Sequence, residues 1–303
     1  MVNIIKKIKN TMLYKKYKFW CEYILKEKLN GQKKLIKKRY KQNFQKELDL
    51  DNPKTLNEKI QWLKINERDD FHTLVADKYK VREYLKTFSE DYLVPLLFQT
   101  TNYKDINEKN ITTFPCIVKS NSGCGWYKIL RTKDDVNWDE LREICKDWMS
   151  RNFYYYSYEW QYKNIKPCII VEKLLLTKDN KLPNDFKLHF INGDLKFVYC
   201  SIDRSDKNYR KIYSPNWELL DFQWPIKQLN NDNFEEISKP ASFDKMLEIG
   251  KEIAKNFKYV RIDFYDVDGK LYFGEITLHH GAGFNKFSDE KYDSYYGAML
   301  ELK

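Results

Sequence analysis

Apolar residues recur at helical spacing through the first third of the chain. In residues 3–46 isoleucines and leucines alternate with lysines, which makes one side of each predicted helix apolar and the other cationic, and Asn30-Gly31 interrupts the pattern. A sharper amphipathic pattern begins at Leu56, shortly after the turn sequence Asp51-Asn52-Pro53. The helices expected from these patterns cover residues 3–46 in two stretches, 56–66, 77–87, 134–151 and 243–257.

Short apolar runs of β character dominate the pattern from Thr113 onward. Two pairs of these runs are joined by Asn192-Gly193 and Asp268-Gly269, the dipeptides that favour a two-residue hairpin turn. The strands expected from the runs are 114–119, 168–176, 186–191, 195–200, 259–267 and 271–278. Hairpins interleaved with helices predict an α+β fold with antiparallel sheets.

Charge is distributed unevenly along the chain. The formal net charge is +10, but residues 1–46 carry 15 Lys/Arg and two acids, a net charge of +13, which leaves −3 for the rest. A cationic amphipathic segment of this kind can lie on an anionic membrane surface, dock a partner or pack on its own domain, and all three readings stay open. No recognisable nucleic-acid motif is present, so specific nucleic-acid binding is not expected.

Several simple signals bear on where the protein works. No apolar run approaches the ~20 residues needed to span a bilayer, and the lysine-rich start contains no continuous apolar region of the kind found in secretory signals. The six cysteines are widely spaced with no CxxC pair, and we expect them to be reduced. Together these features predict a cytoplasmic protein, with peripheral contact to the inner face of the membrane through residues 1–46 as an open option.

A glycine-containing loop follows the apolar run 114–119. Small residues let the backbone close over an anion and turn its N–H groups toward it, while a lysine supplies a point charge. The loop is not a Walker A sequence, because the GK[ST] ending is absent, and an ordinary turn after a strand would look similar. The residues that would bind a phosphate are Lys119, Ser120, Ser122, Gly123 and Gly125.

The run VRIDFYDVDGKLYFGEIT, residues 260–277, carries acids on both predicted strands. Strand alternation places Arg261 with Asp263 on one face and Glu275 with Thr277 on one face. If the strands pair across Asp268-Gly269, one acid from each strand lies close to the other. Two adjacent carboxylates suit Mg²⁺, which prefers hard oxygen ligands and bridges carboxylates to phosphates. Two solvent-facing acids with an Arg–Asp ion pair are the alternative.

The order of these elements resembles the ATP-grasp superfamily, particularly D-alanine–D-alanine ligases. The matching sequences are Arg261-Ile262-Asp263, the Asp268-Gly269 turn and Glu275-Ile276-Thr277, in which Thr277 replaces the usual asparagine of the ligases. The chain from about Pro53 to Leu302 is similar to the TupA-like group, named for teichuronopeptide synthesis. NPKTLNEKIQWLK, ADKYKVREYL, PNDFKLHFINGDLKF and GEIT carry that similarity. In this group Thr277 looks like the normal residue.

The resemblance implies a role for each matching residue. It implies an ATP-grasp fold, in which two α+β lobes hold ATP between antiparallel sheets, preceded here by a basic helical extension. Lys78, which opens the helix DKYKVREYL, and Lys119 would contact phosphates, and the loop 120–125 would close over them. The hinge residues Glu172, Lys173 and Leu175 would receive adenine. The metal ligands would be Asp263, Glu275 and Thr277, with Arg261 against the transferred phosphate.

Other polar residues are weaker candidates. Lys187 would approach the phosphates, Arg204 and Arg210 would meet an anionic acceptor, and His279 or His280 would orient substrate or take a proton. For the three cations, a surface position around a hairpin is an equally good interpretation. For the histidines, so is a polar strand end.

The resemblance implies an ADP-forming carboxylate–amine ligase that uses ATP and Mg²⁺, with Mn²⁺ as a substitute, and an acyl-phosphate intermediate. Its substrates would be a small-molecule or glycan-linked carboxylate and an amine, joined during capsule or cell-wall polysaccharide decoration. An ATP-dependent sugar kinase and a glycosyltransferase-associated glycan-binding protein with the same fold remain alternatives. The expected division is a basic helical extension (1–50), an N-terminal helical or α/β subdomain (51–113), a small lobe with the glycine-rich loop (114–171) and a large lobe with the metal-binding hairpin (172–303).

Overall fold

The computed structural model describes residues 17, 20–25, 28, 30–202, 209–225 and 236–302. Residues 1–16, five positions between 18 and 29, and residues 203–208, which include Arg204, lie outside these ranges. The chain forms two compact units. Unit 1 contains the chain up to Arg39, Arg68–Tyr79 and Pro95–Leu174, and unit 2 contains Tyr40–Glu67, Lys80–Val94 and the chain from Leu175 onward. The four-part division expected from the sequence stays a prediction.

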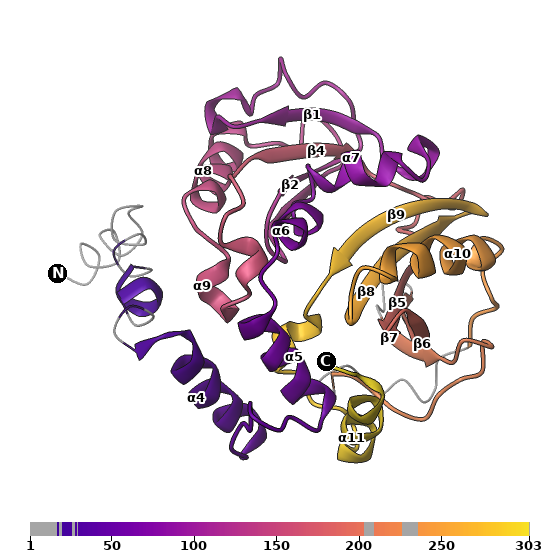
Figure 1. Ribbon diagram of the computed structural model, residues 1–303. Coiled ribbons are helices and arrows are strands. Elements are labelled where there is room, and N and C mark those ends of the chain that lie inside the picture. The colour runs from indigo at the N-terminus through magenta and orange to yellow at the C-terminus, as the bar shows by residue number, and fades with distance from the viewer. Residues whose placement is uncertain are drawn as a thin grey trace. The chain divides into compact units, whose positions relative to one another are not determined.

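Unit 1 is built on a four-stranded antiparallel sheet with the order β1-β4-β2-β3 (Figure 1). Its strands are β1 (Leu96–Thr100), β2 (Cys116–Ser120), β3 (Tyr127–Leu130) and β4 (Ile169–Lys173). Its helices are η1 (Trp20–Leu25), α6 (Asp70–Ala76), η3 (Tyr103–Asp105), α8 (Trp138–Met149), α9 (Tyr154–Ser157) and η4 (Trp160–Tyr162), and α4 (Gln32–Phe44) begins in this unit. Leu141, Cys145 and Trp148 of α8 are buried against the apolar side of the sheet.

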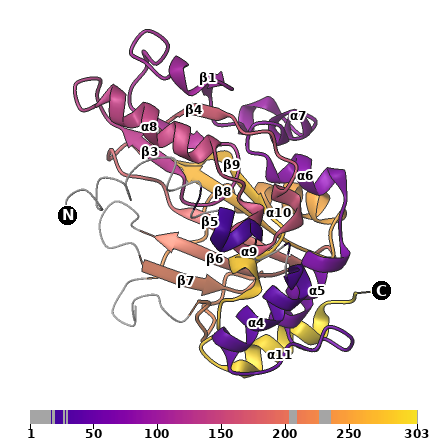
Figure 2. The same ribbon diagram turned by 90° about the vertical axis from the view of Figure 1, so that its left-hand side faces the viewer.

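Unit 2 is built on a five-stranded antiparallel sheet with the order β7-β6-β5-β8-β9. Its strands are β5 (Asp185–Ile191), β6 (Asp194–Ile202), β7 (Tyr209–Tyr213), β8 (Tyr259–Val267) and β9 (Lys270–Thr277). Its helices are α5 (Leu56–Asn66), α7 (Val81–Lys86), η2 (Glu90–Tyr92), α10 (Phe243–Ala254), η5 (His280–Gly283) and α11 (Glu290–Met299). Helix α10 runs along the sheet in both ribbon views (Figures 1 and 2).

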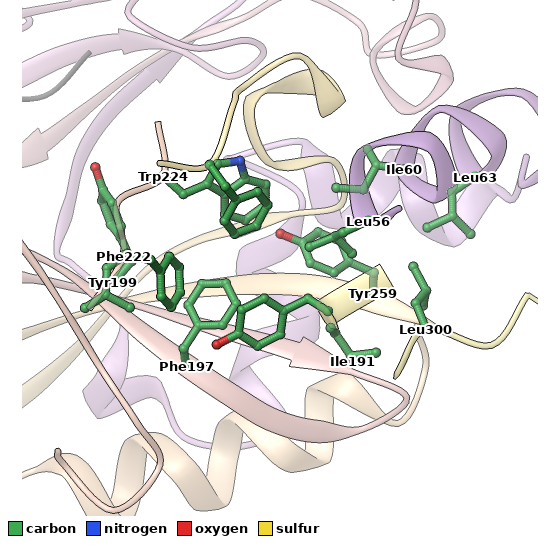
Figure 3. Packing of buried hydrophobic residues seen from close by; sticks show 13 residues of the cluster. Leu56, Ile60, Leu63, Ile191, Phe197, Tyr199, Phe222, Trp224, Tyr259 and Leu300 are labelled. Atoms are coloured by element: carbon green, nitrogen blue, oxygen red, sulfur yellow. The ribbon is translucent and has the colours of Figure 1, made fainter. Parts of the chain in front are cut away.

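Each face of the unit 2 sheet has a different covering. Phe190 and Leu188 point toward α10, where Gly250 leaves room for the Phe190 ring: an added Cβ there would lie 2.6 Å from it. Because side chains alternate along a strand, Asp185, Lys187 and His189 face the other side. Part of that side is covered by α5 and α11, whose apolar residues join the core shown in Figure 3. The remainder of the face carries polar side chains.

Local sequence explains why α5 begins and ends where it does. Thr55 accepts a hydrogen bond from the backbone of Glu58, whose side chain accepts from the Thr55 N–H, which is a complete capping box. Leu56, Ile60 and Leu63 then recur on one face and are buried in the core. The helix predicted over 56–66 is confirmed residue for residue.

The α+β prediction is confirmed, as are both hairpins. Asn192, Gly193, Asp268 and Gly269 all have positive φ, as a tight two-residue hairpin turn requires. The predicted helix over 77–87 starts too early, because α7 begins only at Val81. Asp77 instead ends α6, and its carboxylate accepts the Tyr79 N–H and holds the chain in a turn.

Candidate active site

In unit 1 the predicted phosphate-binding lysine forms an ion pair with a buried glutamate. Lys119 Nζ lies 2.5 Å from Glu172 Oε2, joining the central strands β2 and β4 of the sheet. The Glu172 side chain is 6% exposed and that of Lys119 is 21% exposed. The two residues that sequence analysis assigned to phosphate and to adenine are therefore direct partners.

The loop after β2 is held in place by hydrogen bonds to Asn121. The Asn121 side chain donates to Asp77 Oδ1 at 3.0 Å and accepts from the Cys168 N–H at 2.9 Å. Lys78 donates its backbone N–H to the Asn121 carbonyl at 2.8 Å and its ammonium to the Gly123 carbonyl at 2.7 Å. Lys78 and the loop therefore form one structural element. Asn121 was not among the predicted site residues, because its role depends on partners more than 40 residues away.

The glycines of this loop have different reasons for being glycine. Gly123 has φ +82° and packs so closely on Phe153 that an added Cβ would lie 2.3 Å from its ring. Gly125 has φ +74° with open space around it. Ser120 and Ser122 are buried, and the Ser120 hydroxyl accepts the Ser122 N–H at 3.3 Å. The segment is a compact, preformed loop in which backbone groups are held close to two lysines.

The other predicted hinge residues follow Glu172 along the chain. The N–H of Lys173 donates to the Pro95 carbonyl, and that of Leu174 donates to the Pro115 carbonyl. Leu175 begins the next segment of unit 2.

In unit 2 the predicted acids lie in one cross-strand row. Asp263 on β8 pairs with Glu275 on β9 and with Lys187 on β5. Two residues before Asp263 on β8, Arg261 is the partner of Thr277. Cross-strand partners share a face of an antiparallel sheet, so all five side chains lie on the same side. The structure therefore brings together these predicted residues from three strands.

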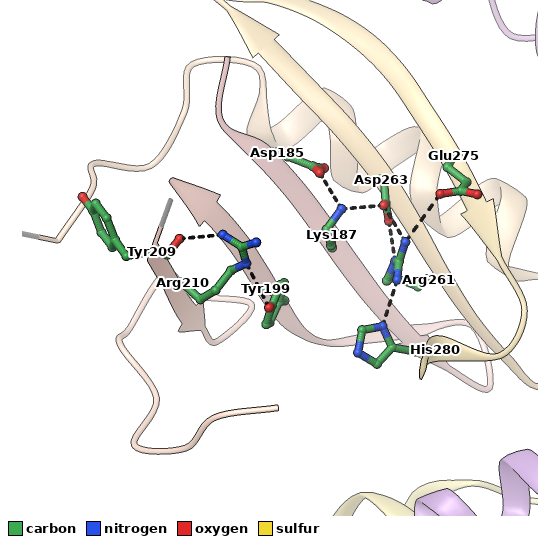
Figure 4. A network of polar contacts seen from close by, with 9 residues as sticks. All are labelled: Asp185, Lys187, Tyr199, Tyr209, Arg210, Arg261, Asp263, Glu275 and His280. Atoms are coloured by element: carbon green, nitrogen blue, oxygen red, sulfur yellow. Dashed lines mark hydrogen bonds and ion pairs between the residues drawn. The ribbon is translucent and has the colours of Figure 1, made fainter. Parts of the chain in front are cut away.

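Charged groups in this row form a continuous network (Figure 4). Lys187 Nζ lies 2.5 Å from Asp185 Oδ2 and 2.7 Å from Asp263 Oδ2. Arg261 donates Nε and Nη2 to the two oxygens of Asp263 at 2.6 Å and 2.7 Å, and its Nη2 lies 3.7 Å from Glu275 Oε2. Within this network three carboxylates thus face two cations.

The network favours the charged forms of Asp263, Lys187 and Arg261. Burial alone would raise the pKa of Asp263, but Arg261 and Lys187 outweigh burial and hold this pKa below its usual value. Burial opposes the ammonium of Lys187, yet Asp185 and Asp263 outweigh it and raise the pKa. The pKa of Arg261 is raised against burial for the same reason, chiefly by Asp263.

The oxygen atoms of the row fit a hard divalent cation. Asp263 and Glu275 are direct cross-strand partners, and the buried Thr277 Oγ1 on the same face makes no hydrogen bond within the described part of the chain. Two carboxylates and a hydroxyl are donors that Mg²⁺ accepts, because it usually keeps several waters and takes phosphate oxygens as well. Within the described ranges, no three His, Cys, Asp or Glu residues gather into a metal cluster, so these residues would supply only part of a coordination shell.

A histidine of the predicted pair contacts the network. His280 Nδ1 lies 2.8 Å from Arg261 Nη1 and must accept this hydrogen bond, because arginine can only donate. The proton of its neutral ring is therefore on Nε2. Burial, followed by the charge of Arg261, lowers the pKa of His280 well below its usual value. His279 is also buried and directly precedes the turn formed by η5.

Two further residues lie on the polar face. Asp185 was missed by the sequence analysis, although it stands two residues before Lys187 on the same strand and thus on the same face. Arg210 on β7 donates to the Tyr199 hydroxyl at 3.1 Å and to the Tyr209 carbonyl at 3.1 Å (Figure 4). Arg204 lies outside the described residues.

The sequence matches the family described as TupA-like ATPgrasp over residues 58–301. The chain belongs to this family. The match covers the lysine–glycine loop and the acidic hairpin, and it confirms the resemblance seen in the sequence. Membership of this TupA-like ATP-grasp family supports an ATP-dependent ligase, and both antiparallel sheets agree with the expected ATP-grasp fold.

Solved structures with a similar fold include two ligases and a synthetase. They are the ATP-grasp ligase PsnB complexed with minimal precursor (14% identical, 69% of this chain and 53% of that chain, TM-score 0.39), the D-alanine–D-alanine ligase from Helicobacter pylori (18%, 81% and 69%, TM-score 0.44) and N5-carboxyaminoimidazole synthetase from Staphylococcus aureus complexed with ADP (15%, 83% and 61%, TM-score 0.41). The TupA-like chain thus spans about half the length of PsnB. No curated protein matches it by sequence. Across the described ranges, no helix has both the length and the apolar character to cross a membrane.

Proposed function

We propose that this protein is an ADP-forming carboxylate–amine ligase that uses Mg·ATP. The observation that carries the proposal is the row Lys187–Asp263–Glu275 with Arg261 beside it, in a chain that belongs to an ATP-grasp family. The row combines oxygen ligands for a cation with two permanent positive charges. Phosphoryl transfer depends on this combination, because it requires positioning and charge stabilisation rather than a nucleophile on the enzyme.

In unit 1 the proposed role of the loop is to bind phosphates. Lys119 supplies a positive charge that Glu172 keeps in place, and Lys78 holds the loop through the Gly123 carbonyl. The backbone N–H groups around Gly123 and Gly125 would contact phosphate oxygens. We assign the hinge segment Glu172, Lys173 and Leu175 to the nucleotide base.

In unit 2 the proposed role of the polar row is to stabilise the transferred phosphoryl group. Asp263, Glu275 and Thr277 would hold Mg²⁺ (or Mn²⁺), which when bound would neutralise phosphate charge. Arg261 and Lys187 keep their positive charges because of the carboxylates beside them. Both cations would stabilise negative charge on the phosphoryl oxygens as it passes to the substrate.

The chemistry proceeds in two displacements. A substrate carboxylate oxygen attacks the γ-phosphorus, the bond from the γ-phosphorus to the bridging oxygen breaks, and ADP leaves with those electrons. The nitrogen of an amine then attacks the carbonyl carbon of the acyl phosphate, the carbon–oxygen bond to phosphate breaks, and the nitrogen loses a proton. We propose His279 as a group that orients substrate near this step, and Arg204 as a contact for an anionic acceptor.

The proposed substrates are a carboxylate and an amine, one of them linked to a glycan, and the proposed setting is capsule or cell-wall polysaccharide decoration in the cytoplasm. The setting is suggested by the resemblance to the TupA-like group, which is named for teichuronopeptide synthesis. Contact of residues 1–46 with an anionic membrane surface belongs to the same proposal, since a cationic segment is attracted to such a surface.

The decisive experiment is calorimetric titration of the full chain with ATP, with and without Mg²⁺. We expect magnesium-dependent binding that an Asp263→Ala/Glu275→Ala variant loses and that the control Asp194→Ala, an exposed acid in the β5–β6 hairpin, retains. Uronic and amino acids are then screened with amines for ADP release. ADP formation that needs no amine, with a stable phosphorylated product, would identify a kinase instead, and no ATP binding under either condition would contradict the proposal.

A further inference from the structure

Helix α5 contains a lysine that is completely buried. Lys64 is 0% exposed, and its ammonium donates to Gln61 Oε1 at 2.9 Å and to the Ala282 carbonyl at 3.0 Å. It also lies 4.4 Å from the centroid of the Phe284 ring. Removing an ammonium from water is costly, and the hydrogen bonds to Gln61 and Ala282 offset part of that cost. A hydrophobic side chain of similar volume commonly stabilises a fold at least as well.

The target of this lysine is an unusual turn. Gly281, Ala282 and Gly283 have φ values of +55°, +53° and +68°, so three consecutive residues are left-handed and one of them is not glycine. This conformation costs an L-residue free energy and persists only where its surroundings impose it. Gln61 and Lys64 supply those surroundings on the side of α5.

Gln61 also binds the turn. Its Nε2 donates to the carbonyls of Ala282 at 2.9 Å and of Gly283 at 2.6 Å. The approach is so close that a Cβ added at Gly283 would lie 2.6 Å from the same nitrogen. Two side chains of α5 therefore make three hydrogen bonds to two successive carbonyls, which fixes the orientation of the turn.

The turn carries His280 at its start, and His280 contacts the polar row. His280 is 6% exposed, and its Nδ1 accepts from Arg261 Nη1 at 2.8 Å. Arg261 in turn donates its other two nitrogens to Asp263. A continuous set of contacts thus runs from the buried ammonium of α5 to the guanidinium of the candidate site.

We propose that Lys64, together with Gln61, is a positioning residue for Arg261 and acts through the 280–283 turn and His280. The significance of this role for the reaction rests on the proposed ligase function, but the positioning itself does not. The hydrogen bonds of Lys64 to Gln61 and to the Ala282 carbonyl lie at the far end of this set of contacts from Arg261. Its expected effect is on the orientation of the guanidinium, which an Nε–H signal reports without any substrate.

The test measures the hydrogen-exchange rate of the Arg261 Nε–H by NMR. The sample is full-length protein labelled with ¹⁵N-arginine, and the Arg261 signal is identified by its loss in the Arg261→Lys variant. The variant is Lys64→Met, which keeps the volume and removes the charge. The matched control is Lys59→Met on the same helix, because Lys59 donates to the Leu300 carbonyl rather than to the turn. We expect about tenfold faster exchange in Lys64→Met and wild-type exchange in Lys59→Met.

A second comparison separates positioning from a general structural role. His280→Phe keeps the ring and removes the Nδ1 acceptor, so adding Lys64→Met to it should change Arg261 exchange little further, since the two residues act in series. Additive effects, equal acceleration at all arginines, or wild-type exchange in Lys64→Met would each overturn the proposal. If wild-type protein bound no ATP, the ligase function would fail while these measurements still decided the positioning. If ATP is bound, kcat should fall about tenfold or more in Lys64→Met with KM for ATP unchanged.

Discussion

Arg261 and Asp263 stand two residues apart on β8, and the guanidinium of one meets the carboxylate of the other through two hydrogen bonds of 2.6 Å and 2.7 Å. Their parallel geometry uses the planar fork of arginine, which a lysine cannot reproduce. A third nitrogen of the same fork reaches His280. Arginine at this position therefore does more than supply a positive charge.

Replacing Arg261 with lysine should consequently impair the reaction even though the charge is kept. We expect the rate of ADP release to fall by about a hundredfold, the scale seen when a preorganised electrostatic group is lost. The melting temperature should change little, because the positive charge is kept. The matched control is Arg151→Lys, because Arg151 makes a similar double contact with Asp147 on α8. Equal activity of the two variants would show that the fork is not needed.

Lys119 offers a separate test of the loop in unit 1. Lys119→Met removes the charge that Glu172 holds in place, so ATP binding should weaken by at least about tenfold, corresponding to one charge-assisted contact. Lys128→Met on the neighbouring strand β3 removes an exposed lysine from the same sheet and should bind ATP normally. Calorimetry of both variants checks the prediction, and unchanged binding by Lys119→Met would exclude its phosphate role.

The two loop glycines should respond differently to alanine. Both have positive φ, so each substitution costs about 1–2 kcal/mol for the backbone alone. Only Gly123→Ala also drives a Cβ to within 2.3 Å of the Phe153 ring, which adds the cost of overpacking, about 1–3 kcal/mol. The free energy of unfolding measured in urea should therefore be lower for Gly123→Ala than for Gly125→Ala. The reverse order would contradict the packing described for this loop.

Two of the buried histidines, His189 and His280, make stability depend on pH. Burial lowers the pKa of His189 well below its usual value, with contributions from His280 and Arg261, and burial with Arg261 does the same for His280. Below about pH 6.5 both histidines bind a proton in the unfolded chain but stay neutral in the folded protein. The free energy of unfolding should thus be constant above about pH 6.5 and fall below it, by about 1.4 kcal/mol per pH unit for each histidine.

Urea unfolding between about pH 5 and 7 measures this dependence above the range in which ordinary carboxylates titrate. The variant His189→Phe keeps an aromatic ring beside Phe197. In this variant, the plot of unfolding free energy against pH should have a slope smaller by the contribution of one proton. Asp263, whose pKa is also lowered, contributes in the same direction only below about pH 4. A slope unchanged by His189→Phe would show that this histidine does not titrate on unfolding.

Sequence predicted the parts of the fold that local chemistry controls. The capping box of α5 and the two Asn-Gly and Asp-Gly turns have their determinants within a few residues, and these elements were found where expected. The edge strands β3, β7 and β1 were missed. Their sequences YKIL, YRKIY and LLFQT are short and carry little apolar alternation, so their pairing depends on neighbouring strands.

The site shows the same division. Alternation along β8 and β9, together with the Asp268-Gly269 turn, was sufficient to place Asp263 beside Glu275. Lys64 gave no such signal, because a lysine on an amphipathic helix is ordinarily exposed to water. Its partner Ala282 is 218 residues away, and only the folded chain brings the two together.

The pairing of α5 with α11 has a consequence for folding during synthesis on the ribosome. Asn57 donates its backbone and side-chain N–H groups to Asp293, a residue 236 positions later. At ordinary rates of translation the two emerge roughly ten to fifty seconds apart. Throughout that interval Leu56, Ile60 and Leu63 have no core to enter, because the strands and the helix that enclose them are still being synthesised. The nascent chain must keep this apolar surface out of contact with other chains, which makes α5 the segment that a chaperone would be expected to bind during synthesis.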